Sequence, residues 1–216
     1  MSHSLHRFGR PPDLRDDWII LAMSSRDVNK KGSAPLLRRF LEIALRHDPL
    51  NWGDIRQGSR YSPATADLLA GVSDESIVHA VYASREATTS CLQDLRREDL
   101  GLSVVVSGLM DDVRRAAAGA GLKPHTAAWS LGVWGKTDRL PPAEVLEVTT
   151  MCGHGLVSPN SVRAVAALLR EGRLTAEEAA ARLSRPCVCG IFNPVRAARC
   201  LRRLARGADE DGLHRA

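Results

Sequence analysis

The chain has 216 residues, of which 44% are hydrophobic, 25% charged and 4% aromatic, as in globular proteins with an aliphatic core. One or two domains fit this length, no stretch of about 18 apolar residues predicts a membrane span, and the first 17 residues lack the apolar region of a secretory signal. The formal net charge is +5. These features predict a cytoplasmic protein, whose cysteines stay reduced and favour metal binding or catalysis over disulfides.

Apolar runs and amphipathic stretches alternate through the first 138 residues. A period of 3.6 residues predicts helices at 34–47, 85–99 and 109–122, and residues 51–63 are expected as a loop. Strand, helix and strand at such short spacings are typical of a parallel sheet. We therefore predict an α/β fold: a parallel or mixed sheet with crossover helices, followed by a mainly helical C-terminal segment. The expected strands are 18–23, 76–84, 102–108 and 125–135.

The start of the first long helix offers a possible anion site. Ser33 is the expected N-cap, and Lys30, Lys31 and Gly32 precede it. The N–H groups at a helix N-terminus can hold a phosphate. No Walker or dinucleotide-binding fingerprint accompanies these residues, so the sequence does not identify the ligand.

Near residues 136–141 the predicted elements change from alternating strands and helices to helices alone. We predict an α/β domain over 1–138, a helical cysteine-containing segment over 139–208 that can pack on it as one domain, and a flexible tail over 209–216. Thr175 with Glu178 forms a capping box, which marks the start of one of the C-terminal helices. The expected helices of this segment are 142–149, 159–171, 176–184 and 194–206.

Two C-terminal segments resemble each other, "MCGHGLVSPNSVRA" (151–164) and "RPCVCGIFNPVRAARC" (185–200). Each has cysteine, then glycine, two apolar residues, an N-cap residue and a proline suited to the first helical position. The N-cap residues are Ser158 and Asn193. The arginines that follow, Arg163 and Arg196, differ by two residues in their distance from the caps, so the sequence suggests a duplication without establishing it.

Cysteines near helix starts favour thiolates, because the helix end stabilises negative charge. We predict that Cys152, Cys187 and Cys189 bind one metal group. Cys-x-Cys spacing fits an iron–sulfur cluster such as 4Fe-4S more easily than a single zinc ion, which is the second choice. Three cysteines leave one metal position open for Lewis-acid chemistry. Cys152 and His154 are therefore the candidate catalytic residues, with His154 as a further ligand or a proton carrier.

The substrate expected at such a site is a small anionic molecule. Nine arginines face three glutamates between residues 170 and 206, which gives this region a charge of +6. Ser158, Asn193, Arg163 and Arg196 are the candidate contacts of the anion, and a lyase or isomerase is the expected class of enzyme. Asn51, Trp52 and Tyr61 are candidates for hydrogen bonding or stacking to a ligand. A regulatory or scaffold module that binds nucleic acid or an acidic partner through its basic helices is an alternative.

A metal-free cysteine enzyme is a further alternative, and a local resemblance supports it. "MCGHG", residues 151–155, resembles the cysteine motif of the proline racemase family. This resemblance implies that Cys152 takes a proton from the α-carbon of an amino acid. In the metal-free alternative, an isomerase or lyase, Cys189 is the expected partner of Cys152. It covers five residues, and no second motif of that family is present. Cys91 and Cys200 lie on the apolar faces of predicted helices and are expected in the core.

Overall fold

The computed structural model describes residues 4–62 and 67–207. Its centre is a five-stranded sheet in the order β3-β2-β4-β1-β5, in which every neighbouring pair is antiparallel. In β1 the side chains of Trp18, Ile20 and Ala22 face one side of the sheet and that of Ile19 faces the other. The strands are β1 (Trp18–Met23), β2 (Asn51–Asp54), β3 (Gly58–Ser59), β4 (Ile77–Tyr82) and β5 (Ser103–Ser107).

The order of the strands gives the domain its topology. Since β4 is antiparallel to both β1 and β2, strands β1 and β2 run in the same direction with β4 between them, and α2 (Ala34–Leu45) connects them. In the same way, α3 (Arg85–Glu98) connects β4 to β5 with β1 between them. Two such split βαβ units interleaved in one antiparallel sheet form a ferredoxin-like arrangement, to which the short β3 adds an edge.

The predicted parallel or mixed sheet with crossover helices is therefore wrong. Strands 18–23, 76–84 and 102–108 form with ends shifted by at most two residues, and so do the helices between them. The error lies in the pairing, because each crossover skips a position that an antiparallel strand then fills. Part of the predicted loop at 51–63 is also wrong, since it contains β2 and β3.

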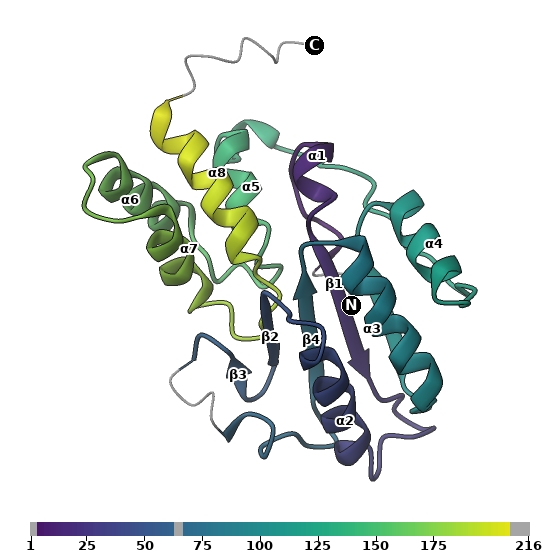
Figure 1. Cartoon of the computed structure of the whole chain (residues 1–216). Coiled ribbons are helices and arrows are strands. Elements are labelled where there is room, and N and C mark those ends of the chain that lie inside the picture. Colours follow the sequence, from purple (N-terminus) through teal and green to yellow (C-terminus); the bar gives the residue numbers. More distant parts are fainter. Residues whose placement is uncertain (1–3, 63–66, 208–216) are drawn as a thin grey trace.

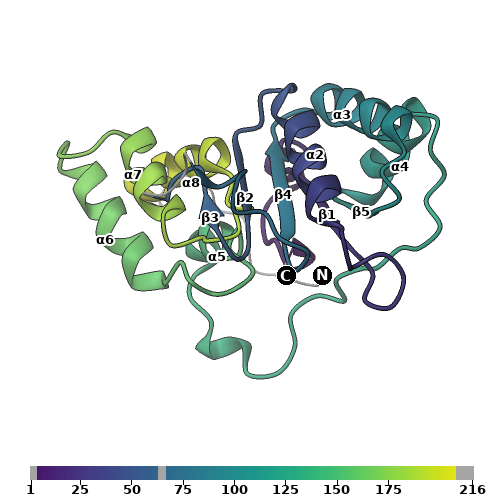
Figure 2. The same cartoon turned by 90° about the horizontal axis from the view of Figure 1, so that it is seen from below.

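The two faces of the sheet carry different layers (Figures 1 and 2). Helices α2 and α3, with α4 (Met110–Gly119), cover one face in a core that includes Phe40, Leu41 and Tyr82. The other face contributes Ile19 and Val81 to a second core, which the C-terminal helices build. These helices are α5 (Ala143–Thr149), α6 (Pro159–Arg170), α7 (Ala176–Ser184) and α8 (Pro194–Arg206).

The C-terminal helices start where the sequence predicts. Ser158 accepts a hydrogen bond from the backbone N–H of Ser161, Asn193 accepts one from that of Arg196, and the capping box of Thr175 forms. The tail predicted over 209–216 lies outside the described residues. In the part of the chain that the structure describes, no helix combines the length and the apolar character needed to cross a membrane.

A fully buried carboxylate fastens the C-terminal helices to the sheet. Asp17, which precedes β1, lies 2.7 Å from the guanidinium groups of both Arg7 and Arg196, and it accepts a hydrogen bond from Asn193 at 3.0 Å. Burial raises the pKa of Asp17, but the two guanidinium groups and Asn193 outweigh it, so that the pKa is lowered overall. This cluster joins the N-terminal segment, β1 and the start of α8.

The segment between α4 and α5 does not pack against the rest of the protein. Every residue from 121 to 140 is exposed, including Trp129 at 59% and Trp134 at 82%. The strand predicted at 125–135 does not form, and the chain runs around the outside of the molecule (Figure 2). Only the short 3₁₀ helix η3 (Thr137–Arg139) interrupts it. The alternating apolar residues at 125–135 are typical of a strand, but no strand of the described sheet pairs with them.

Candidate metal centre

Two turns of the C-terminal segment have the same construction. Cys152 and Cys187 begin them, and in each turn the carbonyl of the cysteine accepts a hydrogen bond from the N–H of a glycine three residues later, Gly155 at 3.0 Å and Gly190 at 3.2 Å. Both glycines have a positive φ, +69° and +77°, which glycine adopts without strain. The second candidate ligand occupies the same place in each turn: His154 in one and Cys189 in the other.

The equivalence continues beyond the turns. Residues 152–159 and 187–194 correspond position by position as Cys-x-His/Cys-Gly, two apolar residues, an N-cap and proline. Each turn follows a short helix, α5 or α7, and leads into a longer one, α6 or α8. The C-terminal segment thus consists of two helix–turn–helix units with the same capping, 35 positions apart in the sequence.

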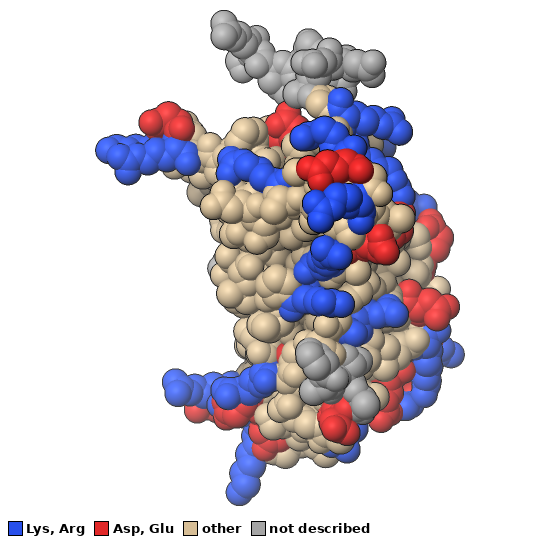
Figure 3. All heavy atoms as spheres, turned by 90° about the vertical axis from the view of Figure 1, so that its left-hand side faces the viewer, with Lys and Arg blue, Asp and Glu red and all other residues tan. Residues whose placement is uncertain are grey.

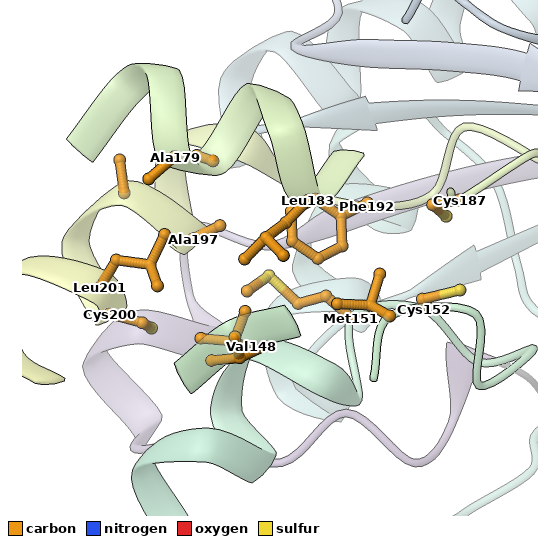
Figure 4. Close-up of a cluster of buried hydrophobic side chains, with 14 of the residues drawn as sticks. Val148, Met151, Cys152, Ala179, Leu183, Cys187, Phe192, Ala197, Cys200 and Leu201 are labelled. Atoms are coloured by element: carbon orange, nitrogen blue, oxygen red, sulfur yellow. The ribbon is translucent and has the colours of Figure 1, made fainter. Parts of the chain in front are cut away.

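The two turns meet in space and bring four candidate ligands together. The Sγ atoms of Cys187 and Cys189 are 4.0 Å apart, and the Sγ of Cys189 lies 3.6 Å from Nδ1 of His154. The thiol of Cys187 also interacts with that of Cys152. Cys152 and Cys187 lie together at one edge of the apolar core in Figure 4. The sequence prediction that sulfurs distant along the chain come together agrees with this geometry.

The surroundings favour negative charge on Cys189 but disfavour it on Cys152 and Cys187. The hydrogen bond from Cys187 lowers the pKa of Cys189, burial opposes this, and the backbone N–H of Ile191 and the charge of Arg7 support it. For Cys187 the contact with Cys152 lowers the pKa, but the hydrogen bond to Cys189 and burial raise it to about 12. The contact with Cys187 and burial raise the pKa of Cys152, which the N–H groups of Leu156 and His154 oppose.

The second turn sits directly on the sheet. Asn51 of β2 donates a hydrogen bond of 2.8 Å from its side chain to the carbonyl of Phe192. A Cβ on Gly190 would lie 2.7 Å from the backbone N of Gly53, closer than real Cβ contacts. Glycine at position 190 therefore serves both the turn and the close approach to β2. The position of the cysteines is fixed by the sheet as well as by the helices.

Two separations within the donor set match those around a single metal ion. Ligands of a tetrahedral zinc ion with Zn–S of about 2.3 Å and Zn–N of about 2.0 Å stand about 3.8 Å apart for S···S and about 3.5 Å for S···N. The separations of 4.0 and 3.6 Å match these values. The three thiols are buried and His154 is exposed, so the site lies just beneath the surface.

The four ligand atoms form a chain of contacts from Cys152 through Cys187 and Cys189 to His154, in which no three atoms all lie within 4.8 Å of one another, so that one ion bound by all four would draw the ends of the chain together. Among the described residues, Asp13, Glu147 and Cys200 form the one group of three potential ligands that all lie within 4.8 Å of one another. That group already holds a cation, because the guanidinium of Arg203 lies 2.9 Å from Asp13 and 2.5 Å from Glu147. Cys200 lies in the apolar core away from Cys152 and Cys187 (Figure 4).

The predicted anion contacts lie elsewhere. Arg196 is fully buried and committed to Asp17, and Asn193 is buried at the start of α8 with its amide bonded to Asp16 and Asp17. Ser158 and Arg163 are exposed; Ser158 caps α6, and Arg163 donates to Asn160. The phosphate site considered at Lys30–Gly32 is filled by the Asp74 carboxylate, which accepts from the N–H groups of Gly32 and Ala34.

His154, expected as a further ligand or a proton carrier, lies beside Cys189. The signal was present, since both segments read Cys-x-ligand-Gly when they are aligned on their glycines.

Comparison with known proteins adds no assignment. No protein-family model, no curated protein and no solved structure matches the chain. The likeness of residues 151–155 to the proline racemase motif therefore rests on those five residues alone.

Proposed function

We propose that this protein binds one zinc-type metal ion through the thiolates of Cys152, Cys187 and Cys189 and through Nδ1 of His154. The observation that carries the proposal is the meeting of two equivalent turns, each of which supplies two ligands with the same spacing. Three thiolates with one imidazole are a common ligand set of structural zinc sites. With four ligands from the chain, the metal position is closed.

The distance between Cys187 and Cys189 favours one ion over an iron–sulfur cluster. In a cluster the thiolates bind separate irons, so their sulfurs stand farther apart than two ligands of one ion. The 4.0 Å between Cys187 and Cys189 corresponds to one shared ion. The ion would join the turn after α5 to the turn after α7, and through Gly190 it would hold both turns against β2.

Metal content in single-residue variants tests this proposal. The protein is purified without oxygen and without chelators, and zinc and iron are measured per chain. We expect about one zinc per chain in the parent protein and less than about a tenth of that in Cys152→Ser, Cys187→Ser and Cys189→Ser. Each variant keeps only three of the four ligands and has lost a thiolate, so it should bind zinc far more weakly.

Cys91→Ser is the matched control. Cys91 is also buried and free, but it lies in the core of α3 next to Tyr82, so that its substitution should leave zinc content unchanged. A brown protein with several irons per chain would mean that the site holds an iron–sulfur cluster and not a single ion. Equal metal content in all four variants, or none in the parent protein even after exposure to zinc, contradicts the proposal.

The lyase or isomerase activity on a small anionic substrate remains a prediction, because it requires an open metal position. The metal-free cysteine enzyme is the interpretation that an absence of metal would favour. We also place the protein in the cytoplasm, where the five free cysteines stay reduced and available for a metal.

A further inference from the structure

The two edges of the sheet differ in how they are protected against pairing with another strand. The free N–H and C=O groups of an edge strand can bond to a further strand, and short length, charged side chains and proline are the usual protection. The edge strand β3 has only two residues, with exposed Arg56 shortly before it and exposed Arg60 directly after it. Figure 3 shows the side of the molecule that carries β3, where basic and acidic side chains gather. This edge is therefore protected.

The opposite edge strand, β5, has none of these protections. Its five residues read Ser-Val-Val-Val-Ser, and no residue between Asp99 and Asp111 is charged or a proline. The strand pairs with β1, and the N–H and C=O groups on its outer side have no backbone partner among the described residues. Val104 is 37% exposed, and of the five residues only Ser107 is buried. The described part of the chain thus leaves an apolar edge open for pairing.

The sequence of β5 is complementary to itself. In an antiparallel pair centred on Val105, Val104 of one chain lies opposite Val106 of the other, and Ser103 lies opposite Ser107. Valine is thus paired with valine and serine with serine, and no two like charges face each other. An interface about a twofold axis uses the same surface on both copies and requires such self-complementarity.

Exposed apolar side chains add to this side of the molecule. Of the twelve large hydrophobic residues that are exposed in the described chain, six lie between 122 and 140, and they include Trp129 and Trp134. Figure 2 shows this segment leaving α4 and passing the side on which β5 forms the edge of the sheet. Five paired residues alone make a small interface. Tryptophan is enriched in protein interfaces, so this segment offers the further apolar surface that a dimer needs.

We propose that β5 is the interface of a dimer, in which it pairs antiparallel with β5 of a second copy about a twofold axis at Val105. The two sheets then become one continuous sheet. A second copy is the partner that β5 fits, because its residues repeat in reverse order about Val105. The protected edge at β3 stops the pairing from continuing into a filament. The interface does not depend on the metal site, whose second turn lies against β2.

Sedimentation of the full chain over a range of concentrations tests the proposal. We expect an equilibrium between monomer and dimer with a dissociation constant of about 1–100 µM, since the interface is small. The dimer should dissociate on dilution. A parent protein that remains a monomer up to about 1 mM would overturn the proposal.

Val104→Lys is the decisive variant, because it gives β5 the charge that commonly protects an edge strand, at a position that is already exposed. We expect its dissociation constant to rise at least about tenfold. Val195→Lys is the matched control, since Val195 is 45% exposed and lies at the start of α8, away from β5. It should dimerise as the parent protein does. Equal dimerisation of Val104→Lys and the parent, or an equal loss in both variants, would overturn the assignment.

Hydrogen exchange of the parent protein tests the interface without any substitution, and it decides the matter if Val104→Lys does not fold. Peptides that contain residues 103–107 should exchange more slowly above the dissociation constant than below it, because the outer N–H groups of β5 become bonded. Peptides from α8 should exchange equally at both concentrations. A dimer in which residues 103–107 exchange as fast as in the monomer would place the interface elsewhere and overturn the proposal.

Discussion

The charge of Asp17 matters more than that of any exposed acidic residue, because two buried guanidinium groups depend on it. Arg7 and Arg196 have side chains that are 5% and 0% exposed, and both face this carboxylate. Removing one member of a buried ion pair leaves its partner uncompensated. The cluster of Asp17, Arg7 and Arg196 therefore favours the one arrangement in which all three charges meet, whatever its net contribution to the free energy of unfolding.

Asp17→Asn should lower the free energy of unfolding at neutral pH by about 3–5 kcal/mol. Asp111→Asn is the control, since Asp111 forms an exposed pair with Arg114 and such pairs contribute about 0–1 kcal/mol. Urea unfolding at pH 7 measures both. A loss for Asp17→Asn as small as that of the control would show that the cluster is not a point of attachment.

The effect of Asp17→Asn should depend on pH. Because the pKa of Asp17 is lowered in the folded protein, its contribution is complete above the unfolded value of about 3.9 and is lost as the pH falls through the folded value. The stability difference between the parent and Asp17→Asn should therefore narrow as the pH falls below about 3.9. Urea unfolding at a series of acidic pH values measures it, and a difference that widens there contradicts this account.

At the scale of the elements, sequence patterns identified most helices and strands because each is encoded by its own residues. The caps Ser158, Thr175 and Asn193 lie at the helix starts where they were expected. Ser33 precedes α2 without a side-chain hydrogen bond, because Asp74, far along the chain, supplies the acceptor. No local pattern could show this, since the two segments meet only in the fold.

The turn at Gly190 gives an element-scale prediction. Gly190→Ala should lower the free energy of unfolding by about 1–3 kcal/mol more than Gly172→Ala, because an added Cβ would press on the backbone of β2. Gly172 has a similar φ of +70° and nothing within 4 Å of an added Cβ, so it isolates the strain of the backbone alone. Chemical denaturation of both variants makes the comparison. Equal losses would mean that the turn does not press on β2.

At the scale of the whole molecule, the pairing of the strands was beyond the sequence. Periodicity shows that 18–23 and 76–84 are strands, but it does not show that β1 lies between β4 and β5. Whether two neighbouring strands are parallel or antiparallel depends on which strands become neighbours, and that is decided by the fold of the whole chain. The candidate ligands were easier to predict, because cysteine, histidine and glycine at fixed spacing are informative without the fold.

The uncovered segment from 121 to 140 has a consequence for how the protein responds to a protease. Lys123, Lys136 and Arg139 lie within it, whereas the sheet and the C-terminal helices share a buried core and the bonds from Asp17 and Asn51. Brief trypsin treatment should cut here first and give two fragments on a denaturing gel. The nicked protein should nevertheless elute from a sizing column with the intact chain. Fragments that separate without denaturant would mean that the peptide link, and not the shared core, keeps the two halves together.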